Sequence, residues 1–123
     1  FAVPGAFTPT CSNQHMPGYV QHAASIREKG VDTIVCVSVN DAFVMDAWGK
    51  DQGAGGNIMM VGDGNGEFTK AIGLEMDGSG FGLGTRSLRY SMIVRDGVVD
   101  TLNIESNPGE AVDSGAENLM SQL

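Results

Sequence analysis

The chain is poor in cysteine and in positive charge, and it has no long apolar run. Two cysteines in 123 residues are too few for the disulfide framework of a small secreted protein. Lys and Arg total 7 against 15 Asp and Glu, for a net charge of −8, which excludes the clustered basic surface that nucleic acids require. The longest apolar run, near residues 31–39, falls far short of the ~20 residues of a membrane span. Neither nucleic acid nor membrane is therefore expected as a partner.

The length and composition fit one compact domain over residues 1–123. Hydrophobic residues make up 41% of the chain, enough for a core, and 18 glycines indicate many tight turns. The chain starts at Phe1 rather than at a methionine, and Phe1–Val3 has the character of the end of a strand. We therefore expect an N-terminally incomplete sequence that lacks its first strands. No secretory signal is visible, so a cytoplasmic protein is predicted, with organellar targeting left open.

Strand and helix patterns alternate along the chain and predict an α/β fold, a central sheet flanked by helices. Asn40 is predicted to cap the helix that follows it, and Pro17 either to kink the first helix or to start a second one. Residues 77–85 are predicted to be a glycine-rich loop, and Arg95-Asp96-Gly97 to be the turn of a hairpin. The expected helices are Gln14–Lys29, Asp41–Lys50, Glu67–Ile72 and Ser114–Leu123, and the expected strands are Val31–Val39, Ile58–Val61, Ser87–Val94 and Val98–Ile104.

Two glycine-rich segments resemble ligand-binding motifs but lack their defining residues. A calcium loop starting at Asp63 would need glycine at its sixth position and glutamate at its twelfth, where Phe68 and Leu74 stand. The glycines of residues 78–84 never reach the spacing of a dinucleotide-binding fingerprint. No cofactor and no metal is therefore predicted.

The two cysteines lie in different surroundings. Cys36 is inside the β-branched run 33–39, where it is most simply a small core residue. Cys11 follows a loop rich in turn-forming residues and precedes a predicted helix. The N-terminus of a helix stabilises a thiolate through free N–H groups and a partial positive charge. Thr8 could return its hydroxyl toward the thiol, and Pro4 and Pro9 would fix the turn.

The loop Pro4-Gly5-Ala6-Phe7-Thr8-Pro9-Thr10-Cys11 resembles the Pro-x-x-x-Thr-x-x-Cys signature of peroxiredoxins, in the form found in their type II, or type five, subfamily. The resemblance covers essentially the whole chain. Further matching blocks are Ser12–Tyr19, Cys36–Val44 with Trp48-Gly49, Asp63–Lys70 and Arg86–Tyr90.

This resemblance implies a thioredoxin-like fold and a role for each motif residue. Cys11 would be the peroxidatic cysteine, Thr8 would orient the peroxide, and Pro4 would shield the pocket. Arg89 would stabilise the thiolate and the peroxide oxygens, a role that suits an always-charged guanidinium with several donors. Arg86 is a weaker candidate for the same neighbourhood, and from the residues alone either arginine would be read as a solvated charge at a strand end.

The implied reaction reduces hydrogen peroxide or an organic hydroperoxide and leaves a sulfenic acid on Cys11. Animal members of the subfamily carry a resolving cysteine near the C-terminal helix, but Ala111–Gly115 contains none. One-cysteine turnover with glutathione and glutaredoxin is therefore expected, with thioredoxin as the other candidate reductant. By the same resemblance, Phe43, Trp48 and Phe81 would contribute to an apolar patch at a homodimer contact.

Other functions compete with this interpretation. A peroxide sensor, or a thioredoxin-fold binding module, would keep the reactive thiol without turning over peroxide. The joint presence of Pro4, Thr8, Cys11 and Arg89 favours the enzyme, because turnover needs donors to the peroxide oxygens. The absence of Cys-x-x-Cys argues against dithiol–disulfide exchange. His15 could face the pocket, where a structural hydrogen bond is favoured over proton transfer.

Overall fold

The computed structural model describes residues 1–123 and is organised around two pairs of strands. β1 (Val35–Ser38) runs parallel to β2 (Met59–Gly62). β5 (Tyr90–Arg95) and β6 (Val98–Ile104) form an antiparallel hairpin with one irregularity in its register. The predicted hairpin is thus present.

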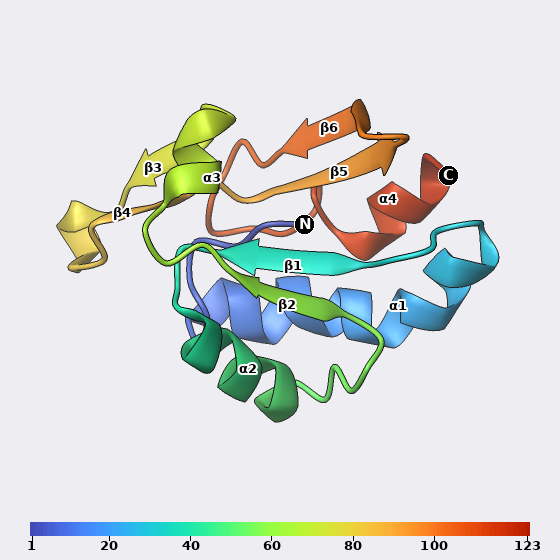
Figure 1. Cartoon of the computed structure of the whole chain (residues 1–123), viewed down its shortest axis with the longest axis horizontal. Helices are drawn as coiled ribbons and strands as arrows, with labels where there is room; N and C mark the ends of the chain where they lie inside the picture. The colour runs from blue at the N-terminus through green and yellow to red at the C-terminus, as the bar shows by residue number, and fades with distance from the viewer.

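The first residues of the chain join the two pairs into one mixed sheet (Figure 1). Ala2 bridges Val37 of β1 in the parallel sense and Tyr90 of β5 in the antiparallel sense. The Ala2 N–H donates to the Tyr90 carbonyl at 2.9 Å, and the Val3 N–H donates to the Val37 carbonyl at 3.1 Å. The order across the sheet is β2, β1, residues 1–3, β5, β6, so the start of this chain lies at the centre of the sheet.

Helices and a second, smaller hairpin complete the structure. No helix combines the length and the apolar composition that crossing a membrane requires. The elements are the π-helical turn η1 (Cys11–His15), the helices α1 (Met16–Glu28), α2 (Ala42–Asp51), α3 (Glu67–Ala71) and α4 (Ala116–Ser121), the 3₁₀ turn η2 (Ser79–Phe81), and the strands β3 (Glu75–Asp77) and β4 (Thr85–Ser87), which pair antiparallel.

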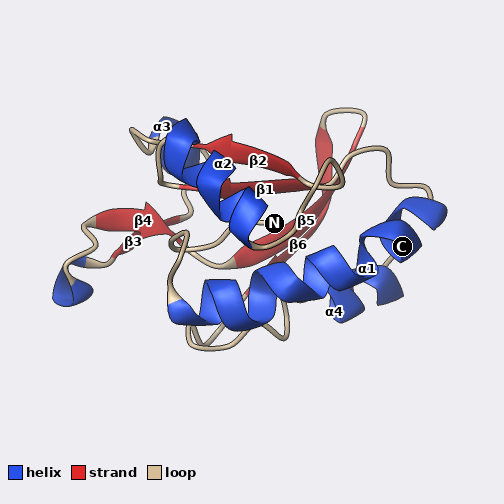
Figure 2. Cartoon of the chain, turned by 90° about the horizontal axis from the view of Figure 1, so that it is seen from below, coloured by secondary structure: helices blue, strands red, loops and turns tan.

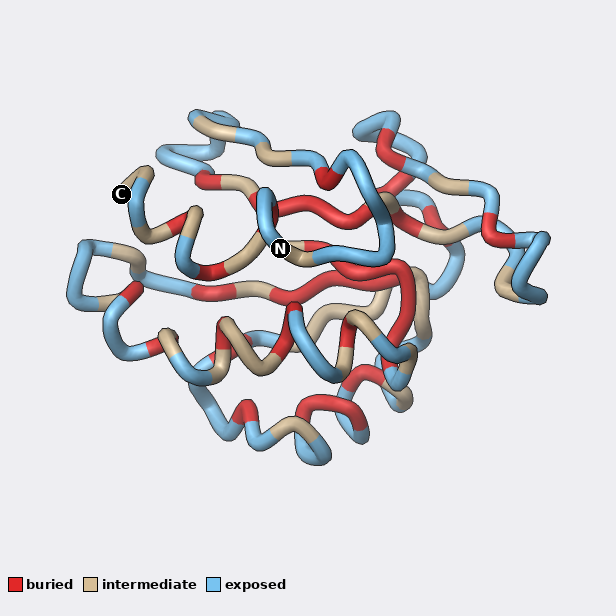
Figure 3. The backbone as a smooth tube through the Cα atoms, turned by 180° about the vertical axis from the view of Figure 1, so that it is seen from behind, coloured by how far each residue is buried: buried red, intermediate tan, exposed pale blue.

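Buried side chains lie on both faces of the sheet, because successive residues of a strand point to opposite sides. Cys36 and Val3 belong to the main hydrophobic cluster, whereas their neighbours Val37 and Ala2 belong to a smaller one. The main cluster is covered by α1, α2 and α4, and α1 and α4 lie side by side (Figure 2). Buried positions run along the central strands and recur at intervals on the helices (Figure 3). The predicted sheet flanked by helices is therefore confirmed.

A cavity of about 870 Å³ opens along the sheet and is lined by residues of both hydrophobic clusters. Apolar side chains of β1, β2 and β5 line much of it, among them Val37, Val61 and Met92. Phe68 of α3 lies at its margin.

Several predicted boundaries were wrong. The strand expected over Val31–Val39 is only Val35–Ser38, because its partner β2 begins at Met59, opposite Val35. The loop expected over residues 77–85 contains η2 and is closed by the β3–β4 hairpin, which the glycines concealed. The strand expected over Ser87–Val94 is two strands, with Leu88 and Arg89 between them. The last helix begins at Ala116 rather than at Ser114.

The cap predicted at Asn40 was also wrong. Asp41 caps α2, since its Oδ1 accepts the Val44 N–H at 2.9 Å. The side chain of Asn40 is used elsewhere, because its Oδ1 accepts the Ala6 N–H at 3.0 Å and the Ser38 hydroxyl at 2.7 Å. Asn40 thereby ties β1 to the loop that precedes Cys11.

Candidate active site

Cys11 lies in the first turn of a long helical run that begins at Pro9. The run changes its hydrogen bonding at η1, where the Met16 N–H donates to the carbonyl of Cys11, five residues earlier. Pro17 has no N–H to donate, and it lies at the start of α1, directly after the change from π-helical to α-helical hydrogen bonding. The helical run passes through Pro17 without a break. Cys11 itself is 0% exposed.

The guanidinium of Arg89 lies against the sulfur of Cys11. Its Nη2 donates to Sγ at 3.2 Å, its Nη1 contacts His15 Nδ1 at 3.0 Å, and its Nε donates to the Pro108 carbonyl at 3.3 Å. Arg89 is 3% exposed and forms no ion pair with a carboxylate. A buried positive charge without a counter-charge is costly. The geometry therefore favours a negative charge on the sulfur, which opposes the tendency of burial to keep the thiol neutral.

His15 is a neutral hydrogen-bonding partner of Arg89. Its Nε2 lies 3.0 Å from the carbonyl oxygen of Ser114, which can only accept, so Nε2 carries the proton and Nδ1 accepts from Arg89. Burial, together with the charge of Arg89, lowers the pKa of His15 to about 3. The structural hydrogen bond expected for this residue is observed, and its ring does face the site.

Thr8 and Pro4 lie in the loop that leads into Cys11 but form no hydrogen bond with Cys11 or Arg89. The Thr8 hydroxyl donates to the Gly5 carbonyl at 2.6 Å, so its oxygen can only accept from a further group. Pro4 is buried. A Cβ on Gly5 would come within 3.0 Å of Thr8 Cγ2 and 3.3 Å of Arg86 Nη1. A side chain at position 5 would therefore crowd Thr8 and Arg86, and either neighbour would have to shift by a few tenths of an ångström.

Arg86 lies outside the site. Its Nε donates to the Leu83 carbonyl at 2.9 Å and its Nη1 to the Val39 carbonyl at 3.2 Å, which connects the β3–β4 hairpin to the end of β1. It has no hydrogen bond to Cys11. Its Nη1 lies next to Gly5, but the hydrogen bond that holds the loop comes from Asn40, whose contact with Ala6 is described above. Nothing in the sequence beyond the resemblance would have indicated that Asn40 serves this loop.

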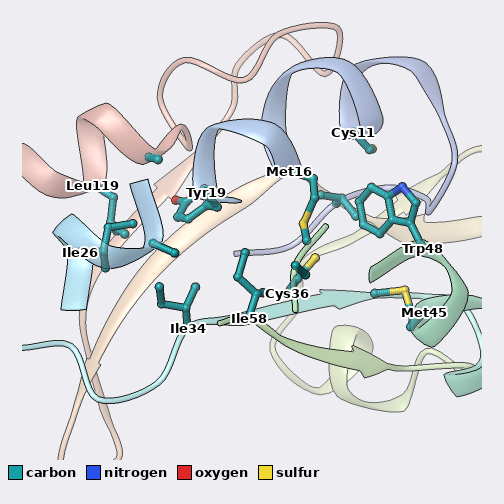
Figure 4. Packing of buried hydrophobic residues seen from close by; sticks show 14 of the residues in the cluster. Cys11, Met16, Tyr19, Ile26, Ile34, Cys36, Met45, Trp48, Ile58 and Leu119 are labelled. Atoms are coloured by element: carbon teal, nitrogen blue, oxygen red, sulfur yellow. The ribbon is translucent and has the colours of Figure 1, made fainter. Parts of the chain in front are cut away.

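The two cysteines lie in different parts of the main core (Figure 4). Cys11 lies on η1 above Trp48 of α2, whose indole N–H donates to the hydroxyl of Ser12 at 3.0 Å. Cys36 lies on β1 with 0% exposure, and burial raises its pKa to about 12. Both cysteines are free. The prediction that Cys36 is a core residue is confirmed.

The predicted apolar patch has two of its three members at the surface. Phe43 and Phe81 are both 87% exposed, whereas Trp48 is 0% exposed. Trp48 is therefore a core residue and not part of a surface patch. Its indole is large enough to fill the space between α2 and the start of the long helical run.

The residues brought together at Cys11 define a nucleophilic site. No group of three or more His, Cys, Asp or Glu side chains is placed to hold a metal ion. The site offers a buried sulfur, a guanidinium that donates to it, and a threonine oxygen on the adjoining loop. Such an arrangement can stabilise charge on a sulfur and on a second atom bound beside it.

The chain is similar to known proteins along its whole length. The family model described as Redoxin matches residues 1–120. The chain belongs to the redoxin family. Chloroplastic Peroxiredoxin-2E of Arabidopsis thaliana is 53% identical over 125 residues, which cover 100% of this chain and 53% of that protein. Peroxiredoxin-2B of the same plant is 47% identical over 123 residues and is covered to 75% of its length. The predicted membership of the type II peroxiredoxins is confirmed.

Solved structures agree with this placement. Reduced Prx3 from Vibrio vulnificus, crystallised in complex with hydrogen peroxide, superimposes with a TM-score of 0.93 and 56% sequence identity over 99% of this chain and 78% of that one. The predicted thioredoxin-like fold is thereby confirmed. The chain spans about half the length of the first curated relatives it matches. Those relatives are chloroplastic by name, and the cytoplasmic location stays a prediction.

Proposed function

We propose that this chain is the catalytic part of a thiol peroxidase that reduces hydrogen peroxide and organic hydroperoxides. The observation that carries the proposal is the contact of 3.2 Å between Arg89 Nη2 and Cys11 Sγ inside a buried site. A guanidinium with no carboxylate partner favours a thiolate, and the thiolate is the nucleophilic form of cysteine. A relative of 56% identity has been crystallised with hydrogen peroxide, which supports peroxide as the substrate.

In the proposed reaction the Cys11 thiolate attacks one oxygen of the peroxide. The S–O bond forms as the O–O bond breaks, so the sulfur is oxidised and the peroxide is reduced. The departing oxygen takes up a proton and leaves as water or an alcohol, and a sulfenic acid remains on Cys11. Arg89 would donate to the oxygens on which charge develops, the Thr8 oxygen would accept the peroxide O–H, and Pro4 would keep water out.

A thiol reductant must then restore Cys11. We expect glutathione to attack the sulfenic sulfur, release water and form a mixed disulfide, which glutaredoxin then resolves. Thioredoxin is the other candidate. Cys36 is unsuited to resolve the intermediate, because it is fully buried in a strand and its raised pKa keeps it protonated.

We also propose that the protein forms a homodimer and that Phe43 of α2 and Phe81 of η2 contribute to the contact. Both side chains are 87% exposed, so a contact that covers them would remove apolar surface from water. Double replacement of Phe43 and Phe81 by serine should shift the sedimentation coefficient from dimer to monomer. A protein that is already monomeric before replacement would refute this assembly.

The test of the activity is peroxide consumption with glutathione and glutaredoxin, comparing the protein with its Cys11→Ser variant. Rapid consumption that disappears in the variant is the expected result. Sulfenic acid that forms quickly on Cys11 without turnover under glutaredoxin or thioredoxin would instead identify a peroxide sensor. A thiol that reacts with peroxide no faster than free cysteine would refute both.

A further inference from the structure

A closed ring of hydrogen bonds connects the active site to the loop between β6 and α4. The loop covers residues 105–115, and it is exposed along most of its length. Its two buried side chains are Glu105, which is 7% exposed, and Ser114, which is 0% exposed. Neither residue has a hydrogen bond to Cys11, and the proposed reaction above assigns no role to either.

The first half of the ring runs from Arg89 through the loop. The Glu105 N–H donates to the Arg89 carbonyl at 3.0 Å, which places Glu105 beside the arginine backbone. The carboxylate of Glu105 reaches forward across the loop. Its Oε1 accepts the Ser114 N–H at 2.8 Å and the Ser114 hydroxyl at 2.9 Å. One carboxylate oxygen thus fixes Ser114 at two points.

The second half returns from the loop to the arginine side chain. The Ser114 carbonyl accepts from His15 Nε2 at 3.0 Å and from the Tyr19 hydroxyl at 2.8 Å. His15 Nδ1 then accepts from Arg89 Nη1. The bond from Ser114 fixes the tautomer of the imidazole, and that tautomer is the one that can accept from a guanidinium.

The loop also holds the guanidinium directly. The Nε of Arg89 donates to the Pro108 carbonyl, and the Thr10 hydroxyl donates to the Gly109 carbonyl at 3.3 Å. Nε is bonded to the loop, and Nη1 is bonded to His15, which is itself bonded to the loop. These two bonds fix the plane of the guanidinium, so Nη2 points toward the sulfur. A planar guanidinium has no freedom to adjust one donor without moving the others.

We propose that Glu105 is a positioning residue for the active site, acting through Ser114 and His15 on the orientation of Arg89. Its carboxylate accepts two hydrogen bonds from Ser114, and the Ser114 carbonyl accepts the Nε2 proton of His15. The free Nδ1 of His15 then accepts from the guanidinium that contacts Cys11. Loss of the carboxylate should let the ring open and Arg89 turn away from the sulfur. The inference rests on the proposed function only for its effect on turnover, because the reactivity of Cys11 can be measured without peroxide.

The experiment compares Glu105→Ala with Glu105→Gln and with the exposed loop variant Glu110→Ala. Glutamine keeps an oxygen that can accept from Ser114, so it should rescue most of the effect, whereas alanine leaves the buried Ser114 donors unpaired. The first readout is the alkylation rate of Cys11 by iodoacetamide as a function of pH, in a Cys36→Ser background. The second is kcat/KM for hydrogen peroxide, with circular dichroism at each pH to show that the variants are folded.

In Glu105→Ala the midpoint of the alkylation profile should move upward by about one pH unit, and kcat/KM should fall roughly tenfold, because small misplacements of a catalytic group have effects of this order. Glu105→Gln and Glu110→Ala should stay close to the starting protein. An unchanged alkylation midpoint in a folded Glu105→Ala would overturn the proposal and leave Glu105 a structural role alone. A shifted midpoint in a protein that turns over no peroxide would uphold the positioning role and refute the proposed function instead.

Discussion

Replacing Arg89 by lysine keeps one positive charge near Cys11 but removes the forked guanidinium. In the structure three N–H groups of this side chain serve the Cys11 sulfur, the His15 ring and the Pro108 carbonyl, which lie in different directions. A lysine ammonium is a compact point charge on a flexible stem. It can approach one of these partners but cannot hold all three, so the contact with the sulfur becomes intermittent.

The size of the effect follows from the contact that is lost. A hydrogen bond to a charged group contributes ~1.5–3 kcal/mol, and each ~1.4 kcal/mol corresponds to a factor of ten. We therefore expect Arg89→Lys to slow the reaction of Cys11 with peroxide by roughly ten- to a hundredfold. Arg89→Met, which also removes the charge, should slow it further. Arg95→Lys is the matched control, because Arg95 lies at the far end of β5 and pairs with Asp100 at the surface.

The assay can use the protein's own fluorescence. Trp48 is the single tryptophan, and its indole is bonded to Ser12, the residue after Cys11. Oxidation of Cys11 should therefore change its emission, and stopped-flow mixing with hydrogen peroxide gives the rate constant directly. Arg89→Lys reacting within about twofold of the unmodified protein, with the same thermal stability, would refute the reasoning, since the contact at 3.2 Å would then contribute almost nothing.

Three further outcomes follow from contacts elsewhere. Cys36→Ser should leave peroxide reduction nearly intact and lower the free energy of unfolding by ~1–3 kcal/mol, because it buries a hydroxyl; a large loss of activity would contradict its assignment to the core. Asn40→Ala should cost ~1–3 kcal/mol in denaturant unfolding, because it leaves the Ala6 N–H without its acceptor, and Asn40→Asp should recover part of this. The pKa of His15 is lowered to about 3 in the folded protein, so as the pH falls His15 takes up a proton in the unfolded chain before it does so in the folded one. The contribution of His15 to the free energy of unfolding is therefore fully present above about pH 6.5 and is lost as the pH falls toward 3. His15→Gln should flatten the unfolding free energy across that window, and an unchanged slope would show that the ring is not held neutral.

The sequence predicted the order of strands and helices well, because hydrophobic periodicity reports which residues are buried. It predicted the boundaries less well, since these depend on partners distant in the chain. β1 is short because β2 starts late, and nothing within residues 31–39 carries that information. The glycines of residues 77–85 predict a loop, and Gly82 and Gly84 do take positive φ angles, but the pairing of β3 with β4 on either side depends on residues outside this segment.

Some residues of the candidate site could be recognised from the local sequence, and others could not. Cys11 could be singled out from its own neighbours, because a cysteine after a turn and before a helix is chemically distinctive. Arg89 lies 78 positions away in sequence, and only the resemblance to a family placed it in the site. Glu105 and Ser114 carry no local signal at all, because their importance arises from three-dimensional contacts with an imidazole and an arginine backbone.

The π-helical turn after Cys11 absorbs one residue of chain length without changing the direction in which Cys11 faces. η1 accommodates one residue more than an α-helical turn would, since the Met16 N–H reaches back to Cys11. Removing either Asn13 or Gln14, both exposed, would return the turn to α-helical hydrogen bonding and leave the residues before it facing nearly the same way relative to α1. Cys11 would then still face Arg89. A residue added to the turn has no such outlet, because it would rotate everything before it by about 100° relative to α1. This segment should therefore tolerate the loss of one residue and not the gain of one.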